Sequence, residues 1–380
     1  MASSLRIDRR VNIAWCMLTH RKGRLAVSMA AIGFAVVIMF MQLGFFNGFN
    51  DSQARLATRF DGDLVVMDAR RAHFNRFTQM RRTHLGQVAA VPGVAVAVAI
   101  LNGTVNLKNP DTGQYRRTYA LAWQPGTRPF LFPGLDEEAL QRLGTVLFDR
   151  KARAIYGQLR PGMPIEIDGQ SHVLGGFFDF GPNFSNDGSV VMSEASWARL
   201  VGPRPMVDWI LVRVAEGAAV EAVRAGLRET LPPGLIVMTP EEMRVREIDY
   251  TTRKAPVGVV FGVGLVVGFI IGTIICYQIL FNEINDHLPQ FATLKAMGFT
   301  GGYLRRVVLT EAALLGVAGF LPGLAGGYAL YHVMERMTGI VMFQTPARAA
   351  FVFVLTVGMC VLAGLIAVKR VLQADPAEVF

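Results

Sequence analysis

The chain has 380 residues, 52% of them hydrophobic and 18% charged, with a formal net charge of +9. This basic excess does not indicate a nucleic-acid-binding protein, because residues 1–24 alone carry a net +5 just ahead of a long uncharged run. Anionic lipid of the inner leaflet is the expected partner of such an arm, and nucleic acid is not.

Four apolar runs are each long enough to cross a bilayer. The first, residues 25–46, contains no charge, and its 22 helical residues would extend about 33 Å against roughly 30 Å of hydrocarbon. The runs predict transmembrane helices at 25–49, 256–282, 307–334 and 349–368. The first run is not a cleaved signal peptide, because its basic lead is too long and no small-residue cleavage site follows it.

Basic residues near the spans predict the orientation of the chain. The arm 1–24 is basic, the segment 283–306 has three basic residues against two acidic ones, and the tail 369–380 begins with Lys369 and Arg370. These three segments are therefore expected in the cytoplasm. The segment 50–255 and the short loop 335–348 are expected on the outer side, so both termini are cytoplasmic.

The insert between the first two spans, residues 51–254, is predicted to be an α+β domain. It lacks cysteine and has 25 basic and 22 acidic residues, so no disulfide holds it together and its charge is nearly balanced. Each end of the insert has a strand-helix-strand pattern. The segments are 63–67, 78–90 and 94–101 at one end, and 209–214, 218–231 and 235–238 at the other. Two such units predict a small domain of split-βαβ type.

The middle of the insert is predicted to be β-rich. In residues 164–178, Ile165 and Ile167 alternate with polar residues ahead of Asp168-Gly169, a pattern typical of a hairpin. Residues 179–188 carry several oxygen-bearing side chains. A calcium loop is conceivable there, but a plain turn is favoured because the spacing and terminal Glu of a calcium loop are missing.

A helix is predicted to lead from the insert back to the membrane. Thr239 as N-cap, Pro240 at the first helical position and Glu242 three residues on make a capping box. No breaker precedes Pro256, so the helix is expected to continue unbroken to the second span. With an extension of the first span over residues 50–59, it would form a two-helix stalk.

The spans themselves contain small residues at spacings that favour close helix packing. The glycines concerned are Gly258, Gly262, Gly264, Gly268, Gly272, Gly319 and Gly323. Packing within one copy or in a dimer is favoured over a ligand cavity. Glu311 is the one carboxylate within reach of the membrane, and carboxylates placed there are candidates for function. Pairing with Arg305 or Arg306 is favoured over a coupling role.

The sequence contains no catalytic motif. A phosphate-binding G-x-x-x-x-G-K-[ST] loop, H-E-x-x-H, C-x-x-C and G-x-S-x-G are all missing, and the six histidines show no ligand spacing. We therefore predict no catalytic residue, no metal site and no cofactor. Any energy for work must come from another protein.

The segment 285–327 resembles the MacB and FtsX permease superfamily, in which a short helix with a K/R-A-x-G ending precedes a glycine-rich span that opens with Glu. The matching positions are Thr293, Lys295, Ala296, Met297, Gly298, Glu311, Gly319 and Gly323. Residues 12–45 and the stretch FDRKARAIYG at 148–157 are most similar to the DevC-type branch. The resemblance extends over essentially the whole chain.

The resemblance implies a bacterial inner-membrane permease of an ABC exporter. Two copies would associate with a separate ATPase subunit that binds ATP, and with a periplasmic adaptor and a TolC-type outer-membrane channel. The short helix would contact the ATPase. The residues concerned are Leu288, Pro289, Phe291, Thr293, Leu294, Lys295, Ala296, Met297 and Gly298.

Alternatives remain for this helix and for the whole chain. Leu288, Phe291, Leu294 and Met297 are spaced three apart and can present an apolar face to a partner, or the helix can lie on the inner leaflet. An FtsX-like signalling protein that regulates a periplasmic cell-wall hydrolase is the alternative function. The size of the insert favours export. A membrane-anchored enzyme is disfavoured because the motifs are missing.

Overall fold

The computed structural model describes residues 22–373 apart from Asn75, Phe77, Arg204, Ala255 and 339–341. The predicted arm up to residue 21, with Cys16, and the predicted tail from residue 374 lie outside the described residues. The chain forms two compact units. The helical unit contains the described residues up to Asn47, Val259–Val333 and those from Met342 onward, and the α+β unit contains the described residues of Gly48–Gly258 and Met334–Val341.

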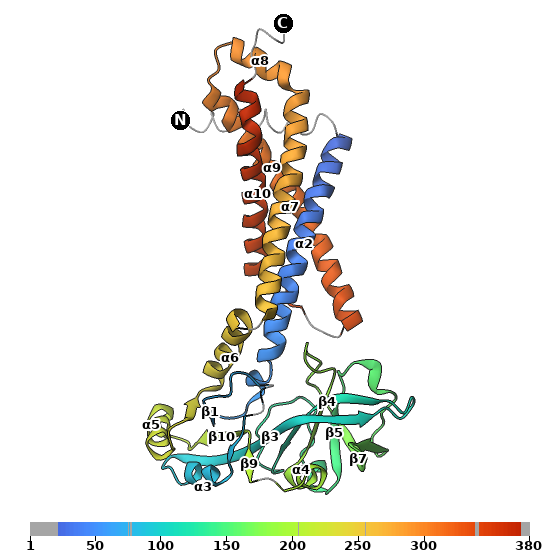
Figure 1. Cartoon of the computed structure of the whole chain (residues 1–380), viewed down its shortest axis with the longest axis vertical. Coiled ribbons are helices and arrows are strands. Elements are labelled where there is room, and N and C mark those ends of the chain that lie inside the picture. Colours follow the sequence, from blue (N-terminus) through green and yellow to red (C-terminus); the bar gives the residue numbers. More distant parts are fainter. Residues whose placement is uncertain are drawn as a thin grey trace. The chain divides into compact units, whose positions relative to one another are not determined.

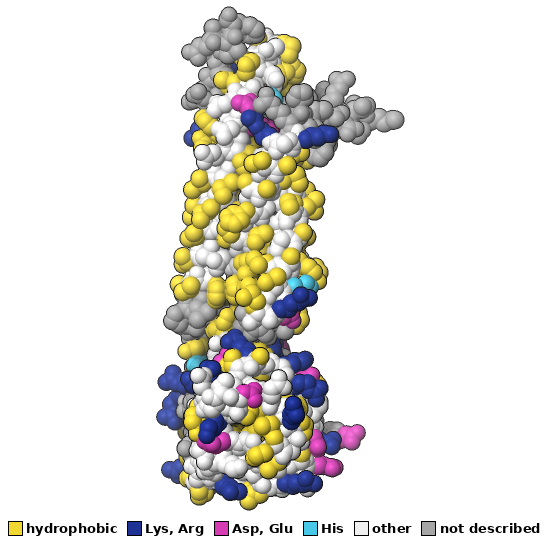
Figure 2. All heavy atoms as spheres, turned by 90° about the vertical axis from the view of Figure 1, so that its right-hand side faces the viewer, with side chains coloured by type: hydrophobic (Ala, Val, Ile, Leu, Met, Phe, Trp, Pro, Cys, Tyr) yellow, Lys and Arg dark blue, Asp and Glu magenta, His cyan; other side chains and the backbone are white. Residues whose placement is uncertain are grey.

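Among the described residues, four helices are long and apolar enough to cross a membrane (Figure 1). They are α2 Lys22–Ala54, α7 Pro256–Asp286, α9 Gly301–Thr338 and α10 Pro346–Gln373, and the short helix α8 Leu288–Ala296 lies between α7 and α9 in the chain. The candidate spans are Lys22–Ala54, Gly258–Asp286, Gly301–Met337 and Pro346–Lys369. Figure 2 shows hydrophobic side chains over most of the visible surface of the long helices. The chain is a membrane protein with four transmembrane helices.

The first half of the sheet in the α+β unit consists of two interleaved β-α-β units. One contains β1 Leu64–Asp68, α3 Thr83–Ala89 and β3 Val94–Lys108, and the other contains β10 Trp209–Val214, α5 Val220–Thr230 and β11 Leu235–Met238. The strand order is β11-β1-β10-β3 with antiparallel neighbours, so each unit has a strand of the other inserted between its own two. The predicted split-βαβ fold is confirmed.

The second half of the sheet is β-rich, as predicted. It adds β4 Tyr115–Trp123, β5 Thr145–Asp149, β6 Pro164–Ile167, β7 Gln170–Phe178 and β8 Ser189–Ser193, and the full order is β11-β1-β10-β3-β4-β8-β5-β7-β6. The 15-residue strand β3 belongs to both halves, because it pairs with β10 up to Ile100 and with β4 from Leu101. Leu107 also pairs with Ile167 of β6, which brings the last strand of the order back to β3.

The predicted hairpin at 164–178 is confirmed. Ile167 of β6 lies opposite Gln170 of β7 around the Asp168-Gly169 turn. Asp168 and Gly169 have φ values of 45° and 78°. Positive φ at both central residues is required by a type I′ turn, and Asp-Gly adopts it readily.

Both faces of the sheet are covered, so β1 is buried along its whole length. Leu64 and Val66 point into one core with Val223 of α5, and Val65 and Met67 point into another. The second core also contains Met243 of α6 Pro240–Asp249 and residues of the short helix η1 Ala57–Arg59. Smaller elements complete the unit. They are β2 Met80–Arg81, which pairs with β9 Met206–Val207, and α4 Glu194–Val201.

The helix that leads out of the insert changes its type after ten residues. Its start is confirmed, because the Thr239 hydroxyl accepts the Glu242 N–H and the Glu242 carboxylate accepts the Thr239 N–H. However, α6 ends at Asp249 and continues as the π-helix η4 Tyr250–Lys254. The chain therefore stays helical as far as Lys254, as predicted, but its last turn is a π-helix and not an α-helix. Proline at position 256 has no N–H for the Thr252 carbonyl one turn earlier, so the regular α-helical hydrogen bond is not available there.

Candidate functional site

The predicted coupling helix α8 is packed into the helical unit by two of its residues. Phe291 is 2% exposed and Ala292 is 0% exposed, while Pro289 and Thr293 lie on the surface. The expected apolar stripe is therefore wrong, because Phe291 belongs to the core of this unit. The geometry of a helix explains the error: at 100° per residue each step of three turns back 60°, so Leu288 and Met297 point in opposite directions.

The end of α8 exposes apolar side chains instead. Gly298 has φ of +89° and donates its N–H to the Lys295 carbonyl, while the Phe299 N–H reaches back to the Leu294 carbonyl. This pair of bonds is a Schellman motif, which stops the helix and turns the chain sharply. Met297 is 62% exposed and Phe299 is 40% exposed. We call residues 296–300 the docking turn.

The remaining predicted residues of α8 have intermediate or high exposure. Leu288, Leu294 and Lys295 are half-buried, and Ala296 is exposed beside Met297. At the end of α7, just before α8, Asp286 forms an ion pair with Arg24 of α2. The start of α8 is therefore held next to the ends of two long helices in the helical unit.

Glu311 of α9 lies inside the helical unit. It is 1% exposed and forms a side-chain hydrogen bond with Glu283 of α7, which is 7% exposed. Arg305 and Arg306 are exposed, and among the described residues no ion pair connects either of them to Glu311. The favoured pairing of Glu311 with these arginines is therefore wrong. A carboxyl pair joins α7 to α9 instead.

The predicted glycines mostly lie where helices approach one another. An added Cβ at Gly319 would lie 2.6 Å from Ile32, and one at Gly323 would lie 2.5 Å from Val36 and 3.0 Å from the Gly33 carbonyl oxygen. Three glycines of α7 make similar contacts. Added Cβ atoms at Gly264, Gly268 and Gly272 would meet Gln42, Ile38 and Met359, respectively.

Two of the predicted glycines make no contact with another long helix of the same chain. Gly262 has no atom within 4 Å of an added Cβ, and Gly258 faces the backbone of Thr252 in η4. Their spacing fits the predicted motif, but spacing alone does not reveal which face of a helix a neighbour covers.

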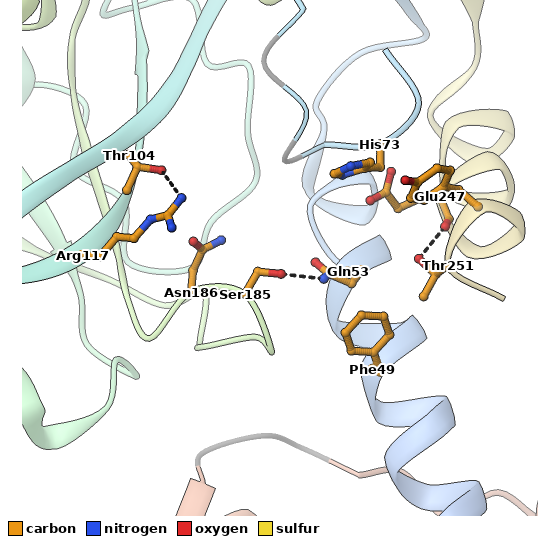
Figure 3. Close-up of a pocket in the computed structure, with 10 residues that line it drawn as sticks. Phe49, Gln53, His73, Thr104, Arg117, Ser185, Asn186, Glu247 and Thr251 are labelled. Atoms are coloured by element: carbon orange, nitrogen blue, oxygen red, sulfur yellow. Dashed lines mark hydrogen bonds between the residues drawn. The ribbon is translucent and has the colours of Figure 1, made fainter. Parts of the chain in front are cut away.

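The α+β unit contains a polar pocket that the sequence did not reveal. Figure 3 shows it between α2, the strands β3 and β4, and α6. Its volume is about 380 Å³. The walls come from widely separated parts of the chain, including Gln53, His73, Arg117, Asn186 and Glu247. No local motif links them, because the sheet brings them together.

One wall of the pocket is the 179–188 loop, where the sequence favours a plain turn over a calcium loop. The Asn183 side chain accepts the N–H groups of Ser185 and Asn186, which makes a tight turn. Asp187 pairs with Arg153, and Asp179 pairs with Arg150 and Lys151. These contacts fit the favoured turn. Among the described residues, no group of three or more His, Cys, Asp or Glu could hold a metal ion.

The FDRKARAIYG stretch holds this loop in place. Asp149 is 0% exposed, and its carboxylate accepts the N–H groups of Phe180 and Gly181 at 3.0 and 2.8 Å. Arg55, just after α2, donates to the Phe180 carbonyl at 3.1 Å. At the pocket itself, Gln53 donates to the Ser185 hydroxyl at 2.8 Å. The loop is therefore fixed to both the sheet and the end of α2.

The opposite wall contains a buried carboxyl group. Glu247 is 4% exposed and accepts the Phe74 N–H at 3.1 Å. Burial raises its pKa to about 8, although Arg71 and Arg246 oppose this shift. Beside it, His73 stacks on Tyr250 with ring centroids 4.7 Å apart, and burial lowers the pKa of His73.

We predict that Glu247 makes the α+β unit less stable as pH rises. Between about 4.5, its ordinary pKa, and about 8 the folded chain binds the proton that the unfolded chain has lost. The free energy of unfolding therefore falls with rising pH across this window. From pH 5 to pH 8, Glu247→Gln should lose several degrees less in its unfolding temperature than the parent protein does. Tryptophan fluorescence of the full-length chain during heating would measure this, and parallel losses in both proteins would contradict it.

Comparisons with known proteins match nearly the whole described chain. The model of the MacB-like periplasmic core domain matches residues 25–230, and that of the FtsX-like permease C-terminal domain matches residues 258–376. The search of curated proteins returned no match.

Two solved structures are similar to about half of this chain. The periplasmic region of MacB from Actinobacillus actinomycetemcomitans is 9% identical, with 49% of this chain and 92% of that chain covered and a TM-score of 0.39. The extracellular domain of the noncanonic ABC-type transporter YknZ from Gram-positive bacteria is 10% identical, with 47% and 98% covered and a TM-score of 0.35.

Proposed function

Because this chain belongs to the MacB-like and FtsX-like permease family of ABC-type transporters, we propose that it is the permease subunit of a tripartite exporter. It would lie in the bacterial inner membrane as a homodimer, with both termini in the cytoplasm and the α+β unit in the periplasm. A separate ATPase subunit would bind and hydrolyse ATP, and the chain would need no cofactor of its own. A periplasmic adaptor and a TolC-type channel would complete the DevC-type or MacB-like export path.

The docking turn is the observation that carries this proposal. Met297 and Phe299 expose apolar area on a turn whose backbone is fixed by the Schellman motif. Phe299 also packs against Tyr303 of α9, with ring centroids 4.9 Å apart. A small fixed apolar projection suits insertion into a groove of a partner. Through α8 and α9, movement of the ATPase would reach Glu283 and Glu311 and the long helices.

We predict that Met297→Asp abolishes co-purification of the ATPase subunit with this protein from detergent extracts. A carboxylate at a desolvated contact costs several kcal/mol unless it finds a partner. Met297→Leu is the matched control, because it keeps an apolar side chain of similar volume and should retain the ATPase. Both variants should reach the membrane at the parent level.

Equal recovery of the ATPase with Met297→Asp and the parent protein would overturn the contact. The neighbouring reading frames test the wider role. An ATPase gene beside a single-span adaptor with a coiled-coil hairpin supports export, whereas an ATPase gene beside a cell-wall hydrolase favours FtsX-like signalling.

A further inference from the structure

We propose that the polar pocket of the α+β unit binds an organic anion: a carboxylate or phosphate group contacts Arg117, and an apolar or planar part contacts Phe49 and the His73–Tyr250 stack. Each of these residues lines the pocket (Figure 3). The volume of about 380 Å³ lies within the range of small-molecule sites, about 300–1,000 Å³. The inference stands apart from the export role, because it concerns binding and not the ATPase.

Arg117 supplies the charge that an anion needs. It is exposed on β4 and donates one long hydrogen bond, 3.4 Å, to the Thr104 hydroxyl. Among the described residues, no ion pair involves Arg117. A guanidinium has five N–H donors in a planar fork that matches carboxylate and phosphate oxygens. Most of that donor capacity is available to a ligand.

Asn186 supplies a second donor in the same pocket. Its Nδ2 atom is buried and has no hydrogen-bond partner in the structure. Burying an amide donor without an acceptor costs about 1–3 kcal/mol, and an oxygen of a ligand would remove that cost. The spare donor capacity of Arg117 and the unpartnered Asn186 Nδ2 favour a group that only accepts hydrogen bonds. Carboxylates and phosphates are such groups.

The acidic residue in the pocket does not oppose an anion. Burial raises the pKa of Glu247 to about 8, so its carboxyl is largely neutral at pH 7. His73 is neutral there too, because burial lowers its pKa. Arg117 is therefore the group with a permanent charge among the residues that line the pocket. The stacked His73 and Tyr250 rings and the Phe49 ring offer contacts for the rest of a ligand.

The pocket is rigid on the side that would hold the anion. Asn186 belongs to the 179–188 loop, and that loop is fixed by Asp149, Arg55 and Gln53. A ligand would touch α2, the sheet and the π-helix η4 at once. Its binding would therefore link the end of the first span to the helix that leads to the second.

The test is calorimetric titration of the full-length protein in phosphatidylcholine nanodiscs, with empty nanodiscs as background. The probes are octyl phosphate, octanoate and inorganic phosphate. We expect saturable binding of octyl phosphate or octanoate at one site per chain, and weaker binding of inorganic phosphate because it lacks an apolar part. Arg117→Gln should weaken binding about tenfold or more, since a hydrogen bond to a charged group is lost.

Arg116→Gln is the matched control, because this neighbour on β4 alternates to the other face of the strand and donates to Gln114. It should bind as the parent does. A second variant, Asn186→Asp, places negative charge beside the anion and should also weaken binding. Unfolding temperatures measured by tryptophan fluorescence show that the variants are folded.

Nanodiscs with added phosphatidylglycerol separate the two sources of such an anion. If that lipid lowers the apparent affinity for octyl phosphate, the occupant is a lipid headgroup; if not, it is a soluble solute, and both results support the site. Binding no greater than in empty nanodiscs would overturn the proposal. Equal affinity of folded Arg117→Gln and the parent protein would do so too.

Discussion

Replacing Asp208 with alanine is expected to lower the free energy of unfolding of the α+β unit by about 3–5 kcal/mol. Asp208 precedes β10 and forms an ion pair with Arg71, 3.1 Å between Asp208 Oδ1 and Arg71 Nη1. The two side chains are 0% and 1% exposed. Removing the carboxylate would leave the Arg71 guanidinium buried without its counter-charge, which is the costly half of breaking a buried pair.

The pair is also the centre of a hydrogen-bond network. Arg71 donates to the carbonyls of Phe74 and Thr78 and to the Asn102 side chain, and it lies over the Trp209 ring at 4.5 Å. The network fixes the segment that carries His73, so its loss would disturb the polar pocket as well. Asp208→Ala would therefore change both the stability of the α+β unit and the shape of the polar pocket.

The matched control for this prediction is Glu241→Ala. Glu241 pairs with Arg244 on α6, but its side chain is 66% exposed, and exposed pairs contribute about 0–1 kcal/mol. Urea unfolding of the full-length protein, followed by tryptophan fluorescence, would measure both variants. A loss below about 1 kcal/mol in Asp208→Ala would contradict this prediction and mean that water or another hydrogen-bond acceptor takes the place of the carboxylate beside Arg71.

The amino-acid sequence predicted the local structure of the α+β unit well where side-chain periodicity determines it. The strand 209–214, the strand 235–238 and the Thr239 cap were found because alternation, turn residues and capping act within a few residues. The interleaving of the two β-α-β units follows from the same patterns. The sequence did not predict the π-helix η4, because residues 250–254 contain no residue that breaks an α-helix. The missing N–H of Pro256 affects the hydrogen bonding of the turn before it.

The sites themselves depend on contacts that no local pattern encodes. Arg71 and Asp208 are charged and 137 positions apart, so the sequence alone suggests surface positions for both. Phe291 and Met297 are both apolar on one short segment, yet one is buried and the other exposed. For Phe291 and Met297 the sequence did contain a clue. Each step of three residues falls 60° short of a full helical turn, so two such steps make these side chains point in different directions. For the polar pocket, the six separated segments that line it share no such pattern.

Glycine spacing in the spans predicted close helix packing, but it did not show which glycines lie at the contacts. Gly323→Leu is expected to lower the stability of the helical unit by about 3 kcal/mol or more. Its Cβ would lie 2.5 Å from Val36 and 3.0 Å from the Gly33 carbonyl oxygen, and the rest of the side chain would enter the same space. The Gly33 backbone cannot yield as a side chain can, so α2 and α9 must separate.

Gly262→Leu adds the same side chain to another span and is the matched control. No atom lies within 4 Å of an added Cβ at Gly262, so a leucine there should leave the unfolding temperature nearly unchanged. Heating both variants in detergent and measuring the soluble monodisperse fraction by size-exclusion chromatography compares them directly. If both lost stability equally, the general loss of glycine and not the α2–α9 contact would be the cause. If Gly323→Leu alone fails, the close packing of α9 against α2 stabilises the helical unit, because within a membrane van der Waals packing replaces the hydrophobic effect as the force between helices.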